Sequence, residues 1–171
     1  MLTLVHVTMG RSEQISQVKV AVGLQALWVS LTGEFRSIVA KLVPNAITSI
    51  DLLEGDGGLG SVFLFNFSPH VAVKWQKEKI VELDESTHKI ALQVIEGGHL
   101  THGYKFYKTG FKFTSIGETE TLVDIFLTYE YDSKEAIKDP SHTLKFAEGF
   151  IYALEKYLHP AAIIANPSAL K

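Results

Sequence analysis

The stretch "AITSIDLLEGDGGLGSVFLFNF" (Ala46 to Phe67) decides the fold, because a glycine-rich loop stands between two segments of strand-like composition. Residues 46–54 and 61–67 are rich in aliphatic, β-branched and aromatic side chains, which favour strands. The loop between them carries four glycines: Gly55, Gly57, Gly58 and Gly60. Glycine adopts positive φ without strain and therefore suits a hairpin connection. The stretch predicts two antiparallel strands joined by this loop.

The same loop has some likeness to a phosphate-binding loop, but its surroundings disfavour nucleotide binding. A P-loop ends in Gly-Lys-Ser/Thr, and here the pair Gly60-Ser61 has no lysine. A dinucleotide-binding loop leads into a helix whose N-terminus holds the phosphate. Here the loop leads into a predicted strand, so that helix is missing.

Length and composition describe an ordinary globular chain. With 171 residues, a single domain with a sizeable core is expected. The net charge of −3 gives no sign of a nucleic-acid or anionic-membrane partner. The chain has no cysteine, which excludes disulfides, thiol catalysis and thiolate metal sites.

Targeting signals are weak. The first ten residues make a poor signal peptide, and no run approaches the roughly 18 apolar residues of a membrane span. We expect a protein of the cytoplasm, with the nucleus as a second location, and no membrane partner. His99 and His102 lie on a loop without a carboxylate nearby in the sequence, so we expect no metal site and no cofactor.

The rest of the sequence supplies the elements of an α+β fold. A strand at residues 15–23 precedes two short helices, at 24–31 and 33–42. After the glycine-loop hairpin, apolar alternation predicts four more strands, at residues 71–84, 88–98, 103–116 and 120–131. Short joints between them indicate an antiparallel meander. A long helix with a broad apolar face follows at residues 139–160. Seven antiparallel strands are thus expected to wrap around one long helix.

Aromatic side chains gather on one side of the predicted sheet. Tyr107, Thr109 and Phe111 alternate along one strand, and Val73 shares a face with Trp75 on another. The set is completed by Leu92 from a third strand and by Phe146 and Phe150 from the long helix. Composition alone is consistent with a solid aromatic core and with a ligand cavity lined by aromatic groups.

Four stretches, in this order, give the chain a family resemblance: "EGDGGLGS", "FLFNFSP", "DESTHKIALQVIEGG" and "FYKTG". With them the chain resembles the plant Bet v I family, the class-10 pathogenesis-related proteins. Within that family it is most similar to the cytokinin-specific, or phytohormone-binding, subgroup. The likeness spans about residues 15–158 and follows the element order derived above.

The resemblance implies a helix-grip fold, in which two short helices form a V beneath the sheet and an internal cavity holds apolar or amphipathic small molecules. Cytokinins, gibberellin-like acids, flavonoids and sterols are the implied ligand classes. The chain is then divided into an N-terminal extension (1–12), a ligand-binding domain (13–160) and a C-terminal tail (161–171). The expected ligand-binding residues are Phe67, His70, Val73, Trp75, Leu92, His99, Tyr107, Thr109, Phe111, Thr128, Phe146 and Phe150. Ligand is expected to enter between the glycine loop, the turn at Pro69-His70 and the last helix.

Polar positions of the expected cavity depart from the subgroup. Where the hormone binders carry a glutamate after the proline of "FNFxP", this chain has His70. A threonine and a tyrosine of the subgroup's last helix appear here as Ala147 and Phe150. The resemblance therefore implies a more apolar and less selective pocket than that of the cytokinin binders.

The fold also occurs in norcoclaurine synthases, which resemble this chain in the "IEGG" stretch and condense an amine with an aldehyde. After "EGG" those enzymes have a tyrosine and then an acid two residues on, where this chain has His99 and Thr101. Lys112 lies near their catalytic lysine, but strand alternation predicts that it faces solvent. Ligand binding is the favoured reading, and we assign no catalytic residue. An enzyme using Lys112 or His99, and a stress protein acting through protein contacts, are the alternatives.

Overall fold

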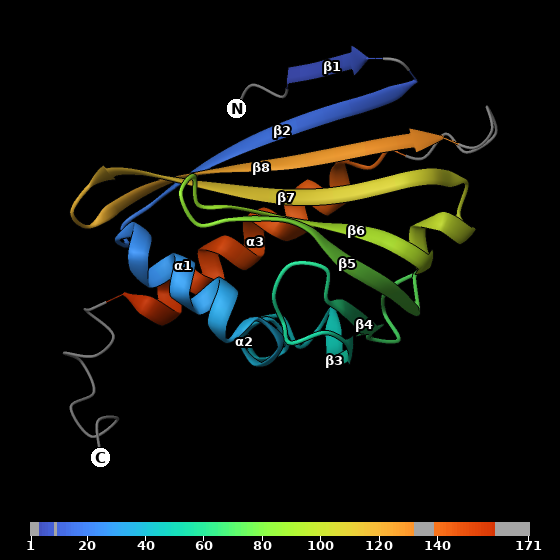
Figure 1. The fold of residues 1–171 in the computed structure, drawn as a ribbon, viewed down its shortest axis with the longest axis horizontal. Coiled ribbons are helices and arrows are strands. Elements are labelled where there is room, and N and C mark those ends of the chain that lie inside the picture. The colour runs from blue at the N-terminus through green and yellow to red at the C-terminus, as the bar shows by residue number, and fades with distance from the viewer. Residues whose placement is uncertain (1–3, 9, 132–138, 160–171) are drawn as a thin grey trace.

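The computed structural model describes residues 4–8, 10–131 and 139–159 (Figure 1). Its strands are β1 (Leu4–Thr8), β2 (Arg11–Val20), β3 (Ile47–Glu54), β4 (Val62–Phe67), β5 (Trp75–Asp84), β6 (Lys89–Gly97), β7 (Tyr104–Gly117) and β8 (Glu120–Tyr131). Its helices are α1 (Leu24–Gly33), α2 (Phe35–Leu42), the short 3₁₀ helix η1 (Gly98–Thr101) and α3 (Ser141–Leu158). The predicted α+β class and element order are confirmed.

In the described residues the strands form one antiparallel sheet in the order β1-β2-β8-β7-β6-β5-β4-β3. Strands β2 to β8 are the seven that the sequence predicts. Strand β1 is additional: it pairs with β2 at the sheet edge, with Leu4 opposite Ile15 and Thr8 opposite Arg11. The interpretation of residues 1–12 as an extension did not foresee this strand. The predicted tail, 161–171, lies outside the described residues.

The glycine-rich loop joins β3 to β4, and the two strands pair antiparallel. Gly55, Gly57 and Gly60 have φ values of 87°, 101° and 85°, the region that glycine adopts without strain. The predicted hairpin is therefore confirmed, and the loop leads into a strand rather than into a phosphate-binding helix.

Helix α3 lies against one face of the curved sheet, and α1 and α2 lie beside it (Figure 1). Its buried residues Leu144, Ala147, Ile151 and Leu154 recur at helical spacing on one side. They pack into a core with inward-facing residues of the sheet, among them Val123, Ile125 and Leu127 of β8. The helix and the sheet thus enclose the interior between them.

The start of β5 differs from the prediction. The sequence reads as one strand from residue 71, whereas residues 68–74 form a loop and β5 begins at Trp75. The Lys74 amine closes this loop by donating hydrogen bonds to the Pro69 and Val71 carbonyl oxygens, at 3.2 and 3.0 Å. As a result Gln76 and Ile80 of β5 point inward, where the prediction had placed Trp75.

Candidate functional site

A cavity of about 370 Å³ lies between the sheet, α2 and α3. This volume falls within the roughly 300–1,000 Å³ of small-molecule sites. Nine of the twelve predicted ligand residues line it: Phe67, Val73, Leu92, His99, Tyr107, Thr109, Phe111, Phe146 and Phe150. The aromatic face of the sheet therefore surrounds a space and does not close into a solid core.

Three predicted ligand residues lie outside the lining, which corrects their expected positions. His70 is exposed in the loop between β4 and β5. Trp75 points outward and covers Gly97, because the strand starts later than predicted and its alternation is reversed. Thr128 also points outward, between the buried Leu127 and Tyr129 of β8, and its hydroxyl donates to a Glu13 carboxylate oxygen at 3.4 Å.

The mouth of the cavity agrees with the prediction at the loop that contains Pro69 and His70 and at α3, and differs from it at the glycine-rich loop. None of the four loop glycines contributes to the lining. The exposed lining residues are Ala72, in the loop before β5, and His142 and Phe146 of α3. Access therefore runs between this loop and α3.

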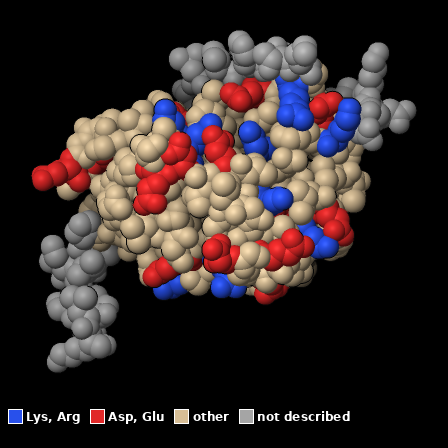
Figure 2. Space-filling view, viewed as in Figure 1, with Lys and Arg blue, Asp and Glu red and all other residues tan. Residues whose placement is uncertain are grey.

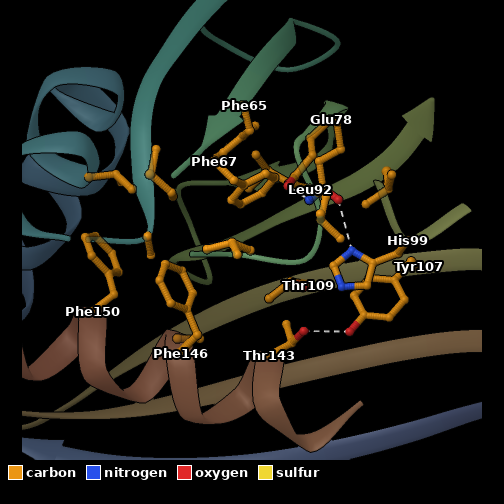
Figure 3. Close-up of a pocket in the computed structure, with 18 of the residues that line it drawn as sticks. Phe65, Phe67, Glu78, Leu92, His99, Tyr107, Thr109, Thr143, Phe146 and Phe150 are labelled. Atoms are coloured by element: carbon orange, nitrogen blue, oxygen red, sulfur yellow. Dashed lines mark hydrogen bonds between the residues drawn. The ribbon is translucent and has the colours of Figure 1, made fainter. Parts of the chain in front are cut away.

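One end of the cavity is polar (Figure 3). Phe146 and Phe150 rise from α3 on one side, and Glu78, His99, Tyr107 and Thr143 gather on the other. A Gln76 amide hydrogen bonds to Glu78 Oε1 at 2.5 Å, and Gln76 Oε1 lies 2.9 Å from His99 Nδ1. The Tyr107 and Thr143 hydroxyls share a hydrogen bond of 2.6 Å.

Glu78 is held in apolar surroundings by the sheet register. It pairs with Phe63 of β4 on one side and with Val94 of β6 on the other. Burial raises the pKa of Glu78 to about 7, and the hydrogen bond from Gln76 opposes this rise. The carboxyl group therefore exchanges its proton near neutral pH, which suits acid–base chemistry and hydrogen-bond recognition alike.

His99 stacks face to face on Tyr107, with ring centroids 3.9 Å apart, and on His142 of α3 at 5.9 Å. Burial lowers the pKa of His99 to about 4, helped by the nearby His142 and His102. At neutral pH the imidazole is therefore uncharged. Its Nε2 atom is buried and has no hydrogen-bond partner within the described part of the protein.

Sequence reasoning missed Gln76, Glu78, His142 and Thr143. The polar pattern "QKE" was visible, but only the true start of β5 shows which of its residues point inward. Ala147 and Phe150 do line the cavity, as expected from the resemblance. Polar groups that the sequence comparison did not consider also line the cavity: Thr143 supplies a hydroxyl from α3 and Glu78 supplies a carboxyl group from β5.

Lys112 is exposed on the outer side of β7, between the buried Phe111 and Phe113. The prediction that it faces solvent is confirmed. No lysine or arginine is found among the described residues that line the cavity. A lysine base at the Lys112 position is therefore not available to a molecule bound inside.

Other kinds of site find little support in the described residues. They contain no group of three or more histidine, aspartate or glutamate side chains placed to hold a metal ion. Blue and red side chains intermingle on the face seen in Figure 2, which shows no broad basic surface of the kind nucleic acids need. Among the helices of the described chain, none combines the length and apolar character needed to cross a bilayer.

The comparison with known families agrees with this architecture: a model of the Pathogenesis-related protein Bet v 1 family matches residues 10–161. The chain belongs to this family. Its Bet v 1 fold is also found in ginseng major latex-like protein 151 from Panax ginseng, which is 27% identical, with a TM-score of 0.78 over 89% of this chain and 100% of that one.

Two curated relatives illustrate the range of the Bet v 1 family. Norbelladine synthase from Narcissus pseudonarcissus is 26% identical over 122 residues, 70% of this chain and 75% of that protein. The isoallergen Dau c 1.0401 from Daucus carota subsp. sativus is 25% identical over 88% of this chain and 98% of its own length. Norcoclaurine synthase from Thalictrum flavum, solved with dopamine and hydroxybenzaldehyde, shares the fold at 20% identity, with a TM-score of 0.74 over 92% of this chain and 96% of that one.

Proposed function

We propose that this Bet v 1 family protein binds an amphipathic small molecule in its cavity, a plant hormone of the cytokinin or gibberellin-like class or a related metabolite. The observation that carries the proposal is the division of the cavity into an apolar body and a polar end. Aromatic rings would bury the flat or ring-shaped part of the ligand. Gln76, Glu78 and His99 would fix its orientation through hydrogen bonds.

The charges at the polar end favour one hormone class over the other. Ionised Glu78 and His99 Nε2, which has no partner among the described residues, both accept hydrogen bonds, so they suit the N–H groups of an adenine-based cytokinin. A gibberellin-like acid brings its own carboxylate, and no lysine or arginine in the described lining would balance it. Such an acid is expected to bind better below pH 7, where Glu78 is protonated.

Calorimetric titration of the purified protein tests the proposal. We expect trans-zeatin to bind with a micromolar or lower Kd at pH 8 and Glu78→Gln to weaken it by roughly ten- to a hundredfold, because a hydrogen bond to a charged group is lost. His70→Ala is the matched control and should leave the Kd unchanged, since His70 lies outside the cavity. Binding of a gibberellin or a flavonoid without zeatin would keep the cavity and refute the cytokinin class. No binding of any of the three would refute the hormone-binding proposal.

A second candidate function is an amine–aldehyde condensation in the same cavity. Two observations favour it: the similarity to norbelladine synthase, and the titratable pair Glu78 and His99 at the cavity end. The outward position of Lys112 removes the lysine that the sequence comparison had suggested as base. Incubation with dopamine and 4-hydroxybenzaldehyde tests it: turnover that Glu78→Gln abolishes and Lys112→Ala spares would establish the enzyme, and absence of product above the buffer rate would remove it.

A further inference from the structure

Packing alone does not explain why the buried Nε2 atom of His99 lacks a hydrogen-bond partner in the described residues. The hydrogen bonds on the other side of the imidazole ring determine whether Nε2 is a donor or an acceptor. The amide nitrogen of Gln76 donates to Glu78, so the amide oxygen faces His99 Nδ1. A carbonyl oxygen only accepts, which means that Nδ1 carries the proton of the neutral imidazole. Nε2 then presents a lone pair.

Protonation of Glu78 reverses the direction of the hydrogen bonds that link Glu78, Gln76 and His99. A carboxylic acid can donate its O–H to the amide oxygen of Gln76, which turns the amide over and directs its N–H group at His99 Nδ1. Nδ1 must then accept, and the single imidazole proton sits on Nε2. The net change is the uptake of one proton, held by Glu78, while His99 stays neutral and exchanges an N–H on Nδ1 for one on Nε2.

We propose that Gln76 couples Glu78 to His99, so that His99 Nε2 offers an acceptor to the cavity when Glu78 is ionised and a donor when Glu78 is protonated. His99 is then a specificity-determining residue whose preference depends on pH. At higher pH it selects a ligand with an N–H or O–H group, and at lower pH a ligand with a carbonyl oxygen or a ring nitrogen. This consequence for ligands rests on the proposed function, whereas the coupling itself belongs to the free protein.

The groups around Glu78 support this coupling. Glu78 meets apolar Phe63 and Val94 across the neighbouring strands, and its charge also acts on Tyr107 of β7. Burial raises the pKa of Glu78 to about 7, so both of its states are populated around neutrality. Burial also raises the pKa of Tyr107 above its usual range, so this neighbour stays uncharged.

His99 is faced by His102 at the end of η1, by His142 from α3, and by Tyr104 and Tyr107 from β7. The two histidines disfavour a charge on His99, and the pKa of Tyr104 is raised by burial and by its tyrosine neighbours. His99, with its pKa lowered to about 4, therefore changes tautomer before it changes charge.

The backbone of Gly98 lies close against the Gln76 side chain. Gly98, the first residue of η1, has a φ of 49°, and a Cβ there would overlap the Gln76 amide. Gln76 itself is 4% exposed and lies between Phe65 and Gly97 in the sheet. The amide is thus held between its two partners, and a rotation about its last bond exchanges oxygen for nitrogen without moving the chain.

The coupling is tested by long-range ¹H–¹⁵N NMR of the unliganded, histidine-labelled protein between pH 5.5 and 8.5. His99→Asn identifies the His99 signals among the seven histidines. We expect the protonated nitrogen of His99 to be Nδ1 at pH 8.5 and Nε2 at pH 5.5, with a midpoint near the pKa of Glu78, about 7. A single tautomer across the range, or full protonation of His99 near pH 6.5, would overturn the proposal.

Two variants each remove a different part of the hydrogen-bonded series Glu78, Gln76 and His99. Gln76→Met keeps the side-chain length without the amide, and Glu78→Gln removes the titration, so each should leave His99 with one tautomer at every pH. His142→Asn is the control: it removes the stacked neighbour and should leave the tautomer change in place. A change that persists in Glu78→Gln, or disappears in His142→Asn, would contradict the assignment. If Gln76→Met fails to fold, Glu78→Gln decides.

Binding of two matched probes tests the consequence for ligands. Indole carries an N–H donor and no acceptor nitrogen, and quinoline carries an acceptor nitrogen and no donor. In the wild type, the ratio of their affinities should change by about tenfold between pH 8.5 and 5.5, in favour of quinoline at low pH, and Gln76→Met should abolish that change. A ratio that does not change with pH would overturn the ligand consequence. Failure of both probes to bind counts against the proposed function, and the NMR result then decides the coupling.

Discussion

Replacing Glu78 with glutamine should stabilise the unliganded protein, and increasingly so as the pH rises. A shift of the Glu78 pKa from 4.5 to about 7 corresponds to about 3 kcal/mol of cost for the ionised carboxyl group in the folded state. The folded protein holds this proton more tightly than the unfolded chain, so the cost is small near pH 4.5, grows as the pH rises to 7 and is complete above it. Glutamine keeps the shape and accepts from Gln76 without charge. We expect the difference in free energy of unfolding between Glu78→Gln and the wild type to grow by about 2–3 kcal/mol from pH 5 to pH 8.5.

His99 makes the comparison between variant and wild type necessary. The pKa of His99 is lowered to about 4, so the unfolded chain takes up a proton below pH 6.5 that the folded protein refuses. The neutral, buried His99 therefore contributes to the free energy of unfolding above pH 6.5, and this contribution is lost as the pH falls toward 4. It opposes the effect of Glu78 over nearly the same range, and the wild-type profile alone would hide both. The difference between Glu78→Gln and the wild type isolates the carboxyl group.

Urea unfolding at pH 5, 6, 7 and 8.5, followed by circular dichroism, measures this difference. Glu85→Gln provides the control, because Glu85 is exposed in the turn of the same β5–β6 hairpin. Its effect should stay within about 0.5 kcal/mol at every pH. A pH-independent difference for Glu78→Gln, or a less stable variant at pH 8.5, would refute the argument that Glu78 is ionised at a cost inside the protein.

Three further substitutions test the fold and the site. Gly149→Ala on α3 should stabilise the protein by about 0.5–1 kcal/mol in thermal unfolding, because nothing lies within 4 Å of the added Cβ and alanine favours helices. A lower Tm would show that the added Cβ meets a neighbouring group. Gly97→Ala should destabilise by about 1–3 kcal/mol and alter tryptophan fluorescence, since φ is 73° and the new Cβ would lie 2.6 Å from the Trp75 ring; unchanged stability would contradict the contact. Lys112→Ala should leave ligand affinity unchanged by calorimetry, and weaker binding would place this side chain in the cavity.

Much of the sheet could be predicted because strand alternation repeats every two residues and leaves a clear pattern. On β7 the pattern placed Tyr107, Thr109 and Phe111 on the cavity side and Lys112 outside, as the structure has them. The error at Thr128 was avoidable by the same rule, because the residues on either side of it are apolar and buried. Long apolar periodicity likewise located α3 to within two residues at each end.

The polar end of the cavity was missed because its position depends on where β5 begins. Val71, Val73 and Trp75 alternate as a strand would, yet hydrogen bonds from Lys74 and between Val71 and Ser68 fold this segment into a loop. A shift of one residue moves every side chain of a strand to the other face. The sequence pattern therefore predicts that Gln76 and Glu78 point outward. Only the tertiary contacts of the loop before β5 show that they point inward.

The cost of these inward polar groups is itself an argument that the cavity has a use. Glu78 sits between Phe63 and Val94, where an aliphatic side chain would fill the space without any loss of hydration. Gln76 partly satisfies the carboxyl group, while His99 Nε2 is left without a partner in the described structure. Polar groups that serve only packing are normally paired in full. Incomplete pairing around an open, apolar cavity is the arrangement expected of a site whose missing hydrogen bond is supplied by a ligand.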